Sequence, residues 1–162
     1  MTPTTDPLLR PARTDDLAAV ERLLAESDLP TDDIAALFAT RAADFLVAEA
    51  PDDATLVGVA GLEVCCDDIA LLRSVAVRPD WRARGLGQTM VRRLVHDAEL
   101  RGIHALYLLT MTADRYFPRL GFAQVARDAV PEPVAATHEF RTMCPASAVA
   151  MMRPLSTASP SA

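Results

Sequence analysis

Apolar residues recur at helical spacing in two stretches of the chain. Near the N-terminus the pattern predicts a helix from Asp15, with Thr14 as its N-cap and an interruption at Pro30. The apolar face of this helix comprises Leu17, Val20, Leu23 and Leu24. A longer helical pattern follows Pro79 and ends at Gly102, because glycine readily takes the left-handed conformation found after a helix. Each helix is therefore expected to bury one face.

Runs typical of strands lie between and after these helices. Three of them, separated by short turns, predict an antiparallel meander. These three strands span residues 45–49, 56–64 and 69–77. Later strands are expected at residues 105–110, 122–126 and 148–153, and residues 105–110 are nearly all apolar, which favours a buried central strand. Short helices are expected after Thr31 and over residues 113–120 and 131–141.

The order of these elements predicts an α/β fold. A mixed central sheet of about six to seven strands would be flanked by about four to five helices, with one parallel crossover near its middle. The chain has 162 residues, 51% of them hydrophobic, which suits a single domain over residues 8–155 with flexible tails at 1–7 and 156–162. No apolar run approaches the roughly 18 residues that a membrane-spanning helix needs.

Charge and cysteine content narrow the chemistry. A net charge of −6 makes a poor polyanion binder, so neither nucleic acid nor a membrane is expected as a partner. Every cation is an arginine, which excludes Schiff-base, Walker-loop and pyridoxal-phosphate lysines. Cys65, Cys66 and Cys144 form no C-x-x-C pair, so no metal site is expected and a reducing cytoplasm is the expected compartment. Strand alternation at Cys65 and Cys66 favours ordinary burial over joint binding of an arsenic atom.

The stretch at residues 72–88 carries the strongest chemical signal. A buried strand runs into a loop with Arg82 and Arg84, then into Gly-x-Gly at residues 85–87, and a helix is expected from about Gln88. Glycine lets a ligand approach the main chain, and the unpaired N–H groups at a helix start favour an anion. The stretch therefore predicts a phosphate or pyrophosphate site. The alternative is that the two glycines only form a tight turn.

Two motifs resemble those of the GNAT N-acetyltransferase superfamily. Its acetyl-CoA-binding motif resembles Arg82-x-x-Gly85-x-Gly87 preceded by residues 74–79, and its second motif resembles residues 116–122. Within the superfamily, the chain is similar to the arsenic-resistance-associated acetyltransferases and to short amino-acid acetyltransferases of the N-acetylglutamate synthase type. This finer similarity is carried by residues 70–74, 106–110 and 144–148.

The resemblance implies that acetyl-CoA binds where the strand ending at Val77 splays from the strand ending at Thr110. Main-chain groups of the first strand would pair with the pantetheine arm. An N–H near Val75 would donate to the thioester oxygen as it becomes an oxyanion. Pairing through sheet edges, which is common in the superfamily, would give a homodimer. The residues implied in cofactor binding are Val75, Ala76, Val77, Arg82, Ala83, Arg84, Gly85, Leu86, Gly87, Gln88 and Phe117.

The usual proton-transfer residues of the superfamily are missing. Leu71 stands where a glutamate is often found, and Phe117 stands where a tyrosine commonly protonates the departing thiolate. Glu63 is the candidate base, and water that relays the proton to a distant carboxylate is the alternative. Tyr116 is the candidate acid, and a packing role is the alternative. A thiolate whose conjugate pKa is about 8.5 can leave without full protonation.

Arg73 and His138 are the candidate substrate-binding residues. Arg73 lies in an apolar strand run and needs a partner. It would either form a buried ion pair with Glu63 or an aspartate, or clamp the carboxylate of an acceptor in a bidentate manner. His138, with Glu139 and Arg141 on the same segment, would face either the acceptor or water.

These residues together predict an acetyl-CoA-dependent N-acetyltransferase. The amine of a small molecule would attack the thioester directly, and acetyl-CoA would be the co-substrate. An amino acid or an amino-acid-like compound, with an arsenic- or phosphorus-containing analogue among the candidates, is the expected acceptor. Two alternatives stay open: a non-catalytic acetyl-CoA-binding sensor or regulator, and a protein N-acetyltransferase.

Overall fold

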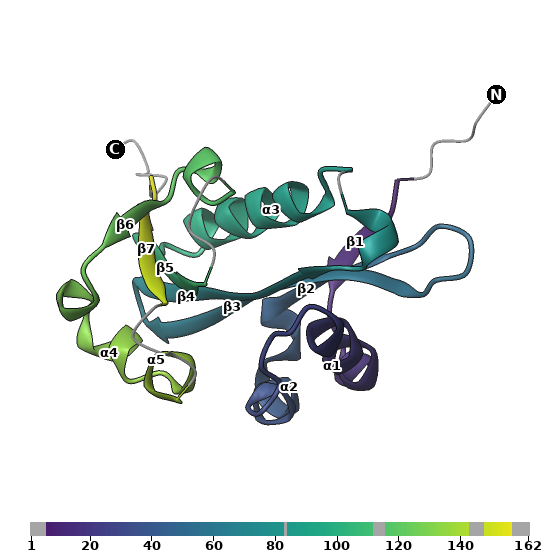
Figure 1. Ribbon diagram of the computed structural model, residues 1–162, viewed down its shortest axis with the longest axis horizontal. Coiled ribbons are helices and arrows are strands. Elements are labelled where there is room, and N and C mark those ends of the chain that lie inside the picture. The colour runs from purple at the N-terminus through teal and green to yellow at the C-terminus, as the bar shows by residue number, and fades with distance from the viewer. Residues whose placement is uncertain (1–5, 83, 112–115, 143–147, 157–162) are drawn as a thin grey trace. The chain divides into compact units, whose positions relative to one another are not determined.

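The computed structural model describes residues 6–82, 84–111, 116–142 and 148–156. Seven strands form a mixed sheet in the order β1-β2-β3-β4-β5-β7-β6 (Figure 1). The strands are β1 (Leu8–Pro11), β2 (Phe45–Glu49), β3 (Leu56–Cys66), β4 (Ile69–Val77), β5 (Ala105–Thr110), β6 (Ala123–Val125) and β7 (Val149–Pro154). The helices are α1 (Leu17–Glu26), α2 (Ile34–Arg41), α3 (Leu86–Leu100), α4 (Glu132–Ala135) and α5 (His138–Thr142). The predicted fold class is confirmed.

The predicted parallel crossover is the connection from β4 through α3 to β5. β4 and β5 pair in parallel from Ile69↔Ala105 to Leu71↔Tyr107. Pairs β1–β2, β2–β3, β5–β7 and β6–β7 are antiparallel. The parallel pairing of β4 with β5 ends at Leu71, and β4 continues for six more residues, to Val77.

The chain forms two compact units, and β3, β4 and α3 contribute to both. The first unit comprises Met1–Gly61 and Ser74–Val91. In it, α1 and α2 cover one face of β2 and β3 (Figure 1). Their shared core holds Val20, Leu23, Leu24, Ile34, Phe38, Phe45, Val47, Val59 and Ala76. The start of α3 covers the other face, because a Cβ at Gly58 would lie 2.8 Å from the Met90 side chain.

The second unit comprises Leu62–Arg73 and Arg92–Ala162. Its core joins β4, β7, α4 and α5 through Leu71, Val130, Val134, Phe140 and Ala150. Two main-chain hydrogen bonds of 2.7 Å, from His104 to Asp68 and from Leu155 to His104, fix the chain before β5 and after β7. The strand predicted at residues 105–110 has its expected bounds.

The N-terminal expectations need two corrections. Thr14 is not the N-cap of α1: a 3-10 turn spans Thr14–Asp16, Arg13 precedes it, and the Asp16 carboxylate accepts a 2.7 Å hydrogen bond from the Arg13 N–H. The pattern also missed β1, a four-residue strand that ends in proline. Proline donates no ladder hydrogen bond, so such a strand fits only the sheet edge, which is where β1 lies.

The later helices also differ from expectation. Residues 131–141 were expected as one helix but form α4 and α5, separated by Ala136 and Thr137. The helix expected at residues 113–120 is a 3-10 turn at Pro118–Leu120 where it is described, and residues 112–115 lie outside the described chain. α3 starts at Leu86, two residues before Gln88.

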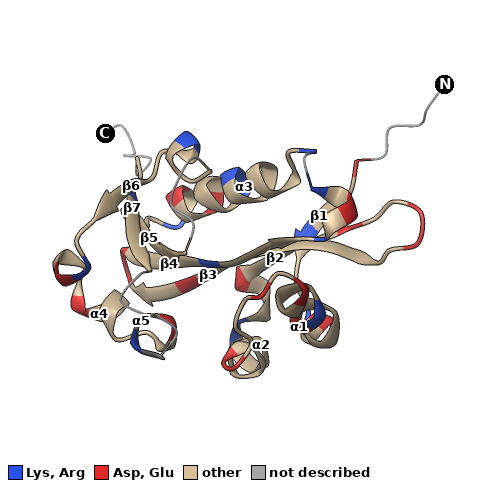
Figure 2. Ribbon diagram, in the orientation of Figure 1, with Lys and Arg blue, Asp and Glu red and all other residues tan. Residues whose placement is uncertain are grey.

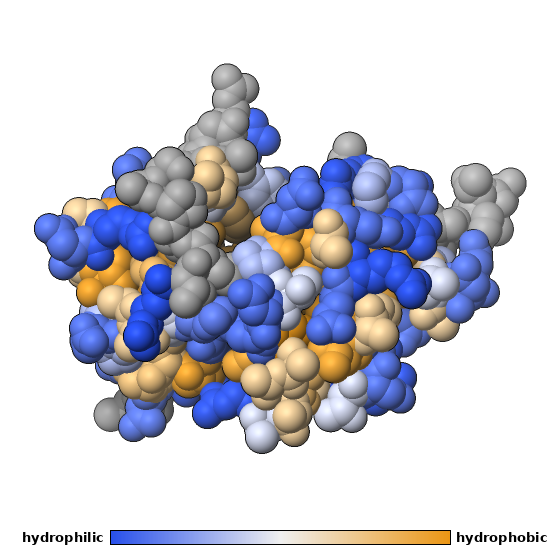
Figure 3. All heavy atoms as spheres, turned by 60° about the horizontal axis from the view of Figure 1, so that its bottom comes forward, coloured by the Kyte–Doolittle hydropathy of each residue, from blue (hydrophilic) through white to orange (hydrophobic). Residues whose placement is uncertain are grey.

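Large apolar side chains are exposed at Leu8, Leu100 and Met111, which belong to different parts of the chain. On the face drawn in Figure 3, apolar residues show between areas of polar ones. Within the residues that the structure covers, no helix combines the length and the apolar character needed to cross a bilayer.

Candidate functional site

The β4–α3 loop of the first unit contains the predicted anion site. After a 3-10 turn at Pro79–Trp81, the chain passes Gly85, whose φ of +78° lies in the left-handed region. The Gly85 carbonyl accepts hydrogen bonds from the Thr89 N–H at 3.0 Å and from the Thr89 hydroxyl at 2.9 Å. The bond from the Thr89 N–H is the first helical hydrogen bond of α3 among the described residues. The first N–H groups of a helix have no partner within it, so the start of α3 is suited to an anion.

Among the predicted loop residues, Leu86 has a second task. Its side chain is buried, and a Cβ at Gly58 would lie 3.3 Å from it. Only the main chain of Leu86 is therefore available to a ligand, whereas Gly87 and Gln88 are half-buried. Ala83 lies outside the described residues.

The second half of β4 carries a backbone irregularity. Ser74 is buried and has a φ of +58°, which is uncommon for a residue with a side chain. Beyond it, Ala76 is buried in the core of the first unit, while Val75 and Val77 are half-buried. Nothing in the sequence marks this position, because a glycine or asparagine would be the usual signal for a left-handed residue.

The three arginines of the loop make different contacts. Arg78 forms a fork with Asp80, with two hydrogen bonds of 2.7 Å. Arg82 donates to the Val77 carbonyl at 2.9 Å and to the Ser27 hydroxyl at 3.2 Å. The guanidinium carbon of Arg84 lies over the Trp81 ring, 4.4 Å from the ring centroid. Arg82, predicted as a cofactor ligand, therefore ties the end of β4 to the residue after α1.

The second unit contains the remaining predicted site residues. Arg73 donates a 2.8 Å hydrogen bond from Nη1 to Glu63 Oε1, across β3 and β4. The Arg73 side chain is 0% exposed and the Glu63 side chain 19%. The structure thus contains the ion pair that was one of the two alternatives for Arg73. It places the candidate base and the candidate substrate ligand in direct contact.

Tyr116 and Phe117 belong to an aromatic cluster. Their rings meet edge to face at 4.9 Å, and Phe117 packs against Phe122 at 5.9 Å. Both precede the 3-10 turn at Pro118–Leu120, so they do not share the α-helix that the sequence predicted. Burial raises the pKa of the Tyr116 hydroxyl, which makes proton donation less favourable. The acid role of Tyr116 stays a prediction.

The last candidates lie near the C-terminal helices and at the end of β3. His138 begins α5 and is half-buried, and Glu139 beside it is buried.

The two cysteines at the end of β3 have different surroundings. Burial raises the pKa of the Cys65 thiol to about 12, whereas the Cys66 thiol donates a hydrogen bond to the Asp68 carboxylate. Cys144 lies outside the described residues. Among the side chains that the structure describes, no group of three or more His, Cys, Asp or Glu is arranged to hold a metal ion.

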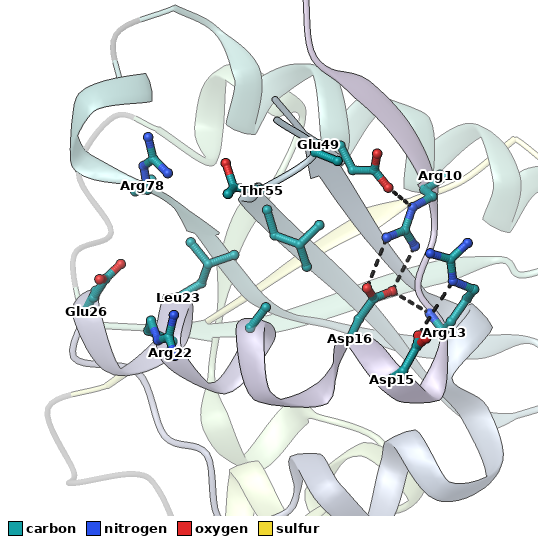
Figure 4. Close-up of a pocket in the computed structure, with 13 residues that line it drawn as sticks. Arg10, Arg13, Asp15, Asp16, Arg22, Leu23, Glu26, Glu49, Thr55 and Arg78 are labelled. Carbon is teal, nitrogen blue, oxygen red and sulfur yellow. Dashed lines mark hydrogen bonds and ion pairs between the residues drawn. The ribbon is translucent and has the colours of Figure 1, made fainter. Parts of the chain in front are cut away.

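A pocket of about 520 Å³ also lies in the first unit, beside α1 and the β2–β3 turn (Figure 4). Its charged lining residues are Arg10, Arg13, Arg22, Arg78, Asp15, Asp16, Glu26 and Glu49. Charged residues of both signs lie along α1 (Figure 2). Arg10 donates to both oxygens of Asp16, at 2.8 and 3.0 Å, and to Glu49. This network holds β1 to α1 and β2, and the pocket includes none of the predicted site residues.

Comparisons with known proteins agree with the architecture. Residues 12–122 match the family model described as Acetyltransferase (GNAT) family. The chain is 32% identical over 123 residues to an amino-acid acetyltransferase of Mycobacterium tuberculosis, covering 74% of this chain and 70% of that protein.

Solved structures extend the likeness. The M. tuberculosis protein Rv2747, crystallised with CoA and a ligand designated NLQ, superposes with a TM-score of 0.78 at 26% identity, over 93% of this chain and 100% of that one. N-acetylglutamate synthase from Neisseria gonorrhoeae, complexed with coenzyme A and L-arginine, gives a TM-score of 0.76 at 20% identity. The match covers 93% of this chain and 34% of the synthase, and it speaks for the fold alone.

Proposed function

Because the chain belongs to the GNAT acetyltransferase family, we propose that it transfers the acetyl group of acetyl-CoA to the amine of an amino acid. The enzyme is an acyltransferase, and acetyl-CoA is its co-substrate. The choice of an amino acid is supported by the relative of M. tuberculosis, whose name is amino-acid acetyltransferase. The observation that carries the cofactor assignment is the β4–α3 loop, with left-handed Gly85 leading into the N-terminus of α3.

The reaction needs no covalent intermediate on the protein. The amine nitrogen attacks the thioester carbon, the C–S bond breaks, CoA leaves as a thiolate, and the amine loses one proton. The proposed oxyanion donor is the main-chain N–H near Val75, and removing such a donor typically costs about 3–4 kcal/mol of transition-state stabilisation. The diphosphate would accept from the N–H groups at the start of α3.

Glu63 is the proposed base. Its side chain is 19% exposed, so it can exchange a proton with solvent or with a bound amine through water. The contact with Arg73 engages Oε1 of the Glu63 carboxylate and helps to orient it. Arg73 as a direct clamp for the acceptor carboxylate, with His138 beside the acceptor, is the second part of the proposal.

The finer substrate assignment concerns the acceptor side chain. The similarity to arsenic-resistance-associated acetyltransferases adds amino acids with an arsenic- or phosphorus-containing side chain to the candidates. These compounds keep the α-amine and α-carboxylate of an amino acid, so a guanidinium at Arg73 would serve both classes in the same way.

The test is an acetylation assay with a panel of amino acids, including phosphinate and arsonate side-chain analogues. Release of the CoA thiol is followed at a fixed acetyl-CoA concentration, and CoA affinity is measured by calorimetry. Thiol release with at least one amino acid is expected. CoA binding with no release on any amine would overturn the enzymatic proposal in favour of a sensor, and acetylation of peptides alone would favour a protein acetyltransferase.

The variant Arg73→Lys separates the two roles of Arg73. A rise in KM for the amino acid, with CoA affinity unchanged, is expected for a carboxylate clamp because lysine lacks the planar fork. A fall in kcat with KM unchanged would assign Arg73 to holding Glu63. If both constants equal those of the parent, Arg73 has neither role.

A further inference from the structure

The three arginines of the β4–α3 loop are not equivalent as phosphate ligands. We propose that Trp81 is a positioning residue that holds Arg84 against a phosphate group of coenzyme A. The inference rests on the proposed function and deepens it, because it names the side chain that supplements the main-chain N–H groups of α3. It also gives Arg82 a structural role, in which its hydrogen bonds join the end of β4 to the residue after α1, in place of the predicted role as a ligand.

Two of the three guanidinium groups are already occupied within the protein. Arg78 uses Nε and Nη2 for its fork with Asp80, at 2.7 Å each. Arg82 uses Nε for the Val77 carbonyl and Nη2 for Ser27. A guanidinium that keeps these contacts has fewer N–H groups left for a phosphate, and it cannot move toward one without giving up the contacts.

Arg84 is held in a different way. The central carbon of its guanidinium lies over the Trp81 ring, 4.4 Å from the ring centroid, in a cation–π contact. Such a contact restricts the side chain through the charge and the ring face, without pairing an N–H with an oxygen acceptor. The guanidinium therefore keeps N–H donors for a phosphate. The charge of Arg84 contributes to the lowered pKa of the nearby Asp80, whose carboxylate accepts its hydrogen bonds from Arg78. Among the residues that the structure describes, Trp81 is the contact that holds the Arg84 guanidinium.

The position of Arg84 explains why its ligand should be a phosphate. It directly precedes left-handed Gly85, and the start of α3 follows, where the first N–H groups of a helix have no partner within it. A fixed cation beside a helix N-terminus favours an anion with several acceptor oxygens, and arginine suits phosphate because its donors form a fork. Trp81 is half-buried and Arg84 is exposed, so the contact with the ring limits where the Arg84 guanidinium lies.

Coenzyme A offers two phosphate sources, the diphosphate and the 3′-phosphate, and the experiment distinguishes them. CoA and dephospho-CoA, which lacks the 3′-phosphate, are titrated by calorimetry into the full chain and its variants. Arg84→Ala should weaken CoA binding at least about tenfold, since a charge-assisted hydrogen bond is lost. If dephospho-CoA shows the same loss, the contact is to the diphosphate; if it shows none, the contact is to the 3′-phosphate. Either result supports the proposal.

Trp81 is tested through its coupling to Arg84. Trp81→Leu should weaken CoA binding about three- to tenfold, and Trp81→Phe should restore most of it because phenylalanine also presents an aromatic face. In the Arg84→Ala background, Trp81→Leu should have almost no further effect. Arg78→Ala is the matched control, because its guanidinium is paired with Asp80, and it should bind CoA like the parent.

A second readout uses the fact that Trp81 is the only tryptophan of the chain. Its fluorescence therefore reports on this pair alone. Arg84→Ala should increase quenching by acrylamide, because the guanidinium no longer covers the ring. The inference would be overturned if Trp81→Leu weakened CoA binding equally in the presence and absence of Arg84. It would also be overturned if Arg84→Ala bound CoA as tightly as the parent. If the parent itself binds no CoA, the proposed function fails instead.

Discussion

The β4–α3 loop of the first unit and the Glu63–Arg73 pair of the second unit are built from different parts of the chain. The loop uses main-chain groups of neighbouring residues, and its conformation depends on a left-handed glycine and a helix start. The pair uses two side chains ten residues apart, on adjacent strands, with a fully buried guanidinium. A local main-chain site tolerates most side chains except at the glycine, whereas a buried ion pair tolerates almost no change in either partner.

The largest effect is expected from breaking the pair on its acidic side. Glu63→Ala leaves the buried Arg73 charge without this carboxylate, and such a change typically costs about 3–5 kcal/mol of unfolding free energy. Urea unfolding followed by circular dichroism measures the cost. Glu63→Gln is the matched control: it keeps an oxygen acceptor for Arg73 and should lose less stability, while kcat falls if Glu63 is the base. A Glu63→Ala variant as stable as the parent would contradict the expectation that the buried ion pair tolerates almost no change in either partner.

A smaller loss is expected from the loop glycine. Gly85→Val places a branched side chain at a φ of +78°, at a cost of about 1–2 kcal/mol, and it hinders approach of a ligand to the main chain. Binding of CoA, measured by calorimetry, should weaken more than tenfold at a ligand-binding cost of more than about 1.4 kcal/mol.

Gly102→Val is a matched control for this change. Gly102 has a φ of +80°, and like Gly85 it has nothing within 4 Å of an added Cβ. The two variants should lose similar stability, but only Gly85→Val should lose CoA affinity. Equal CoA affinity in both variants would show that the loop does not bind the cofactor through its main chain.

The smallest effect is expected at the Arg10–Asp16 ion pair of the first unit, whose aspartate is buried, because asparagine keeps the shape and one acceptor oxygen of the side chain. A hydrogen bond from Arg10 holds the pKa of Asp16 below its usual value of 3.8. The charged Asp16 carboxylate therefore contributes its full stabilisation at pH values above the ordinary aspartate pKa. This stabilisation is lost as the pH falls through the lowered pKa of Asp16 in the folded protein. Asp16→Asn should be less stable than the parent at pH 7, with the difference shrinking below about pH 4. Chemical unfolding at a series of pH values measures this, and a difference that grows in acid would contradict it.

The sequence could predict those features that depend on the main-chain conformation of neighbouring residues. Strands at residues 45–49, 69–77 and 105–110 have their expected bounds, because apolar runs between turn residues are a local signal. The loop between β4 and α3 was also predicted, and its Gly85 has a φ of +78°, whereas Gly87 lies in the first turn of α3. Both are properties of neighbouring residues.

Contacts between distant residues were not predictable in the same way. The sequence offered Glu63 or an aspartate as a partner of Arg73, and only the register of β3 and β4 decides between them. The place of Arg82 in the motif predicts a cofactor ligand, but it gives no sign of the contact with Ser27, 55 residues earlier. The division of residues 131–141 into two helices has, by contrast, a local signal: the Thr137 hydroxyl between them accepts a 3.3 Å hydrogen bond from the Phe140 N–H at the start of α5.

Left-handed Ser74 lies where β4 passes from one compact unit to the other. Leu71 before it is buried in the core of the second unit, and Ala76 after it is buried in the core of the first. A left-handed residue interrupts the extended backbone, so the two segments of β4 need not share one alternation of buried and exposed positions. A substitution scan along β4 should therefore find separate patterns of tolerated polar residues before and after Ser74, each set by its own core.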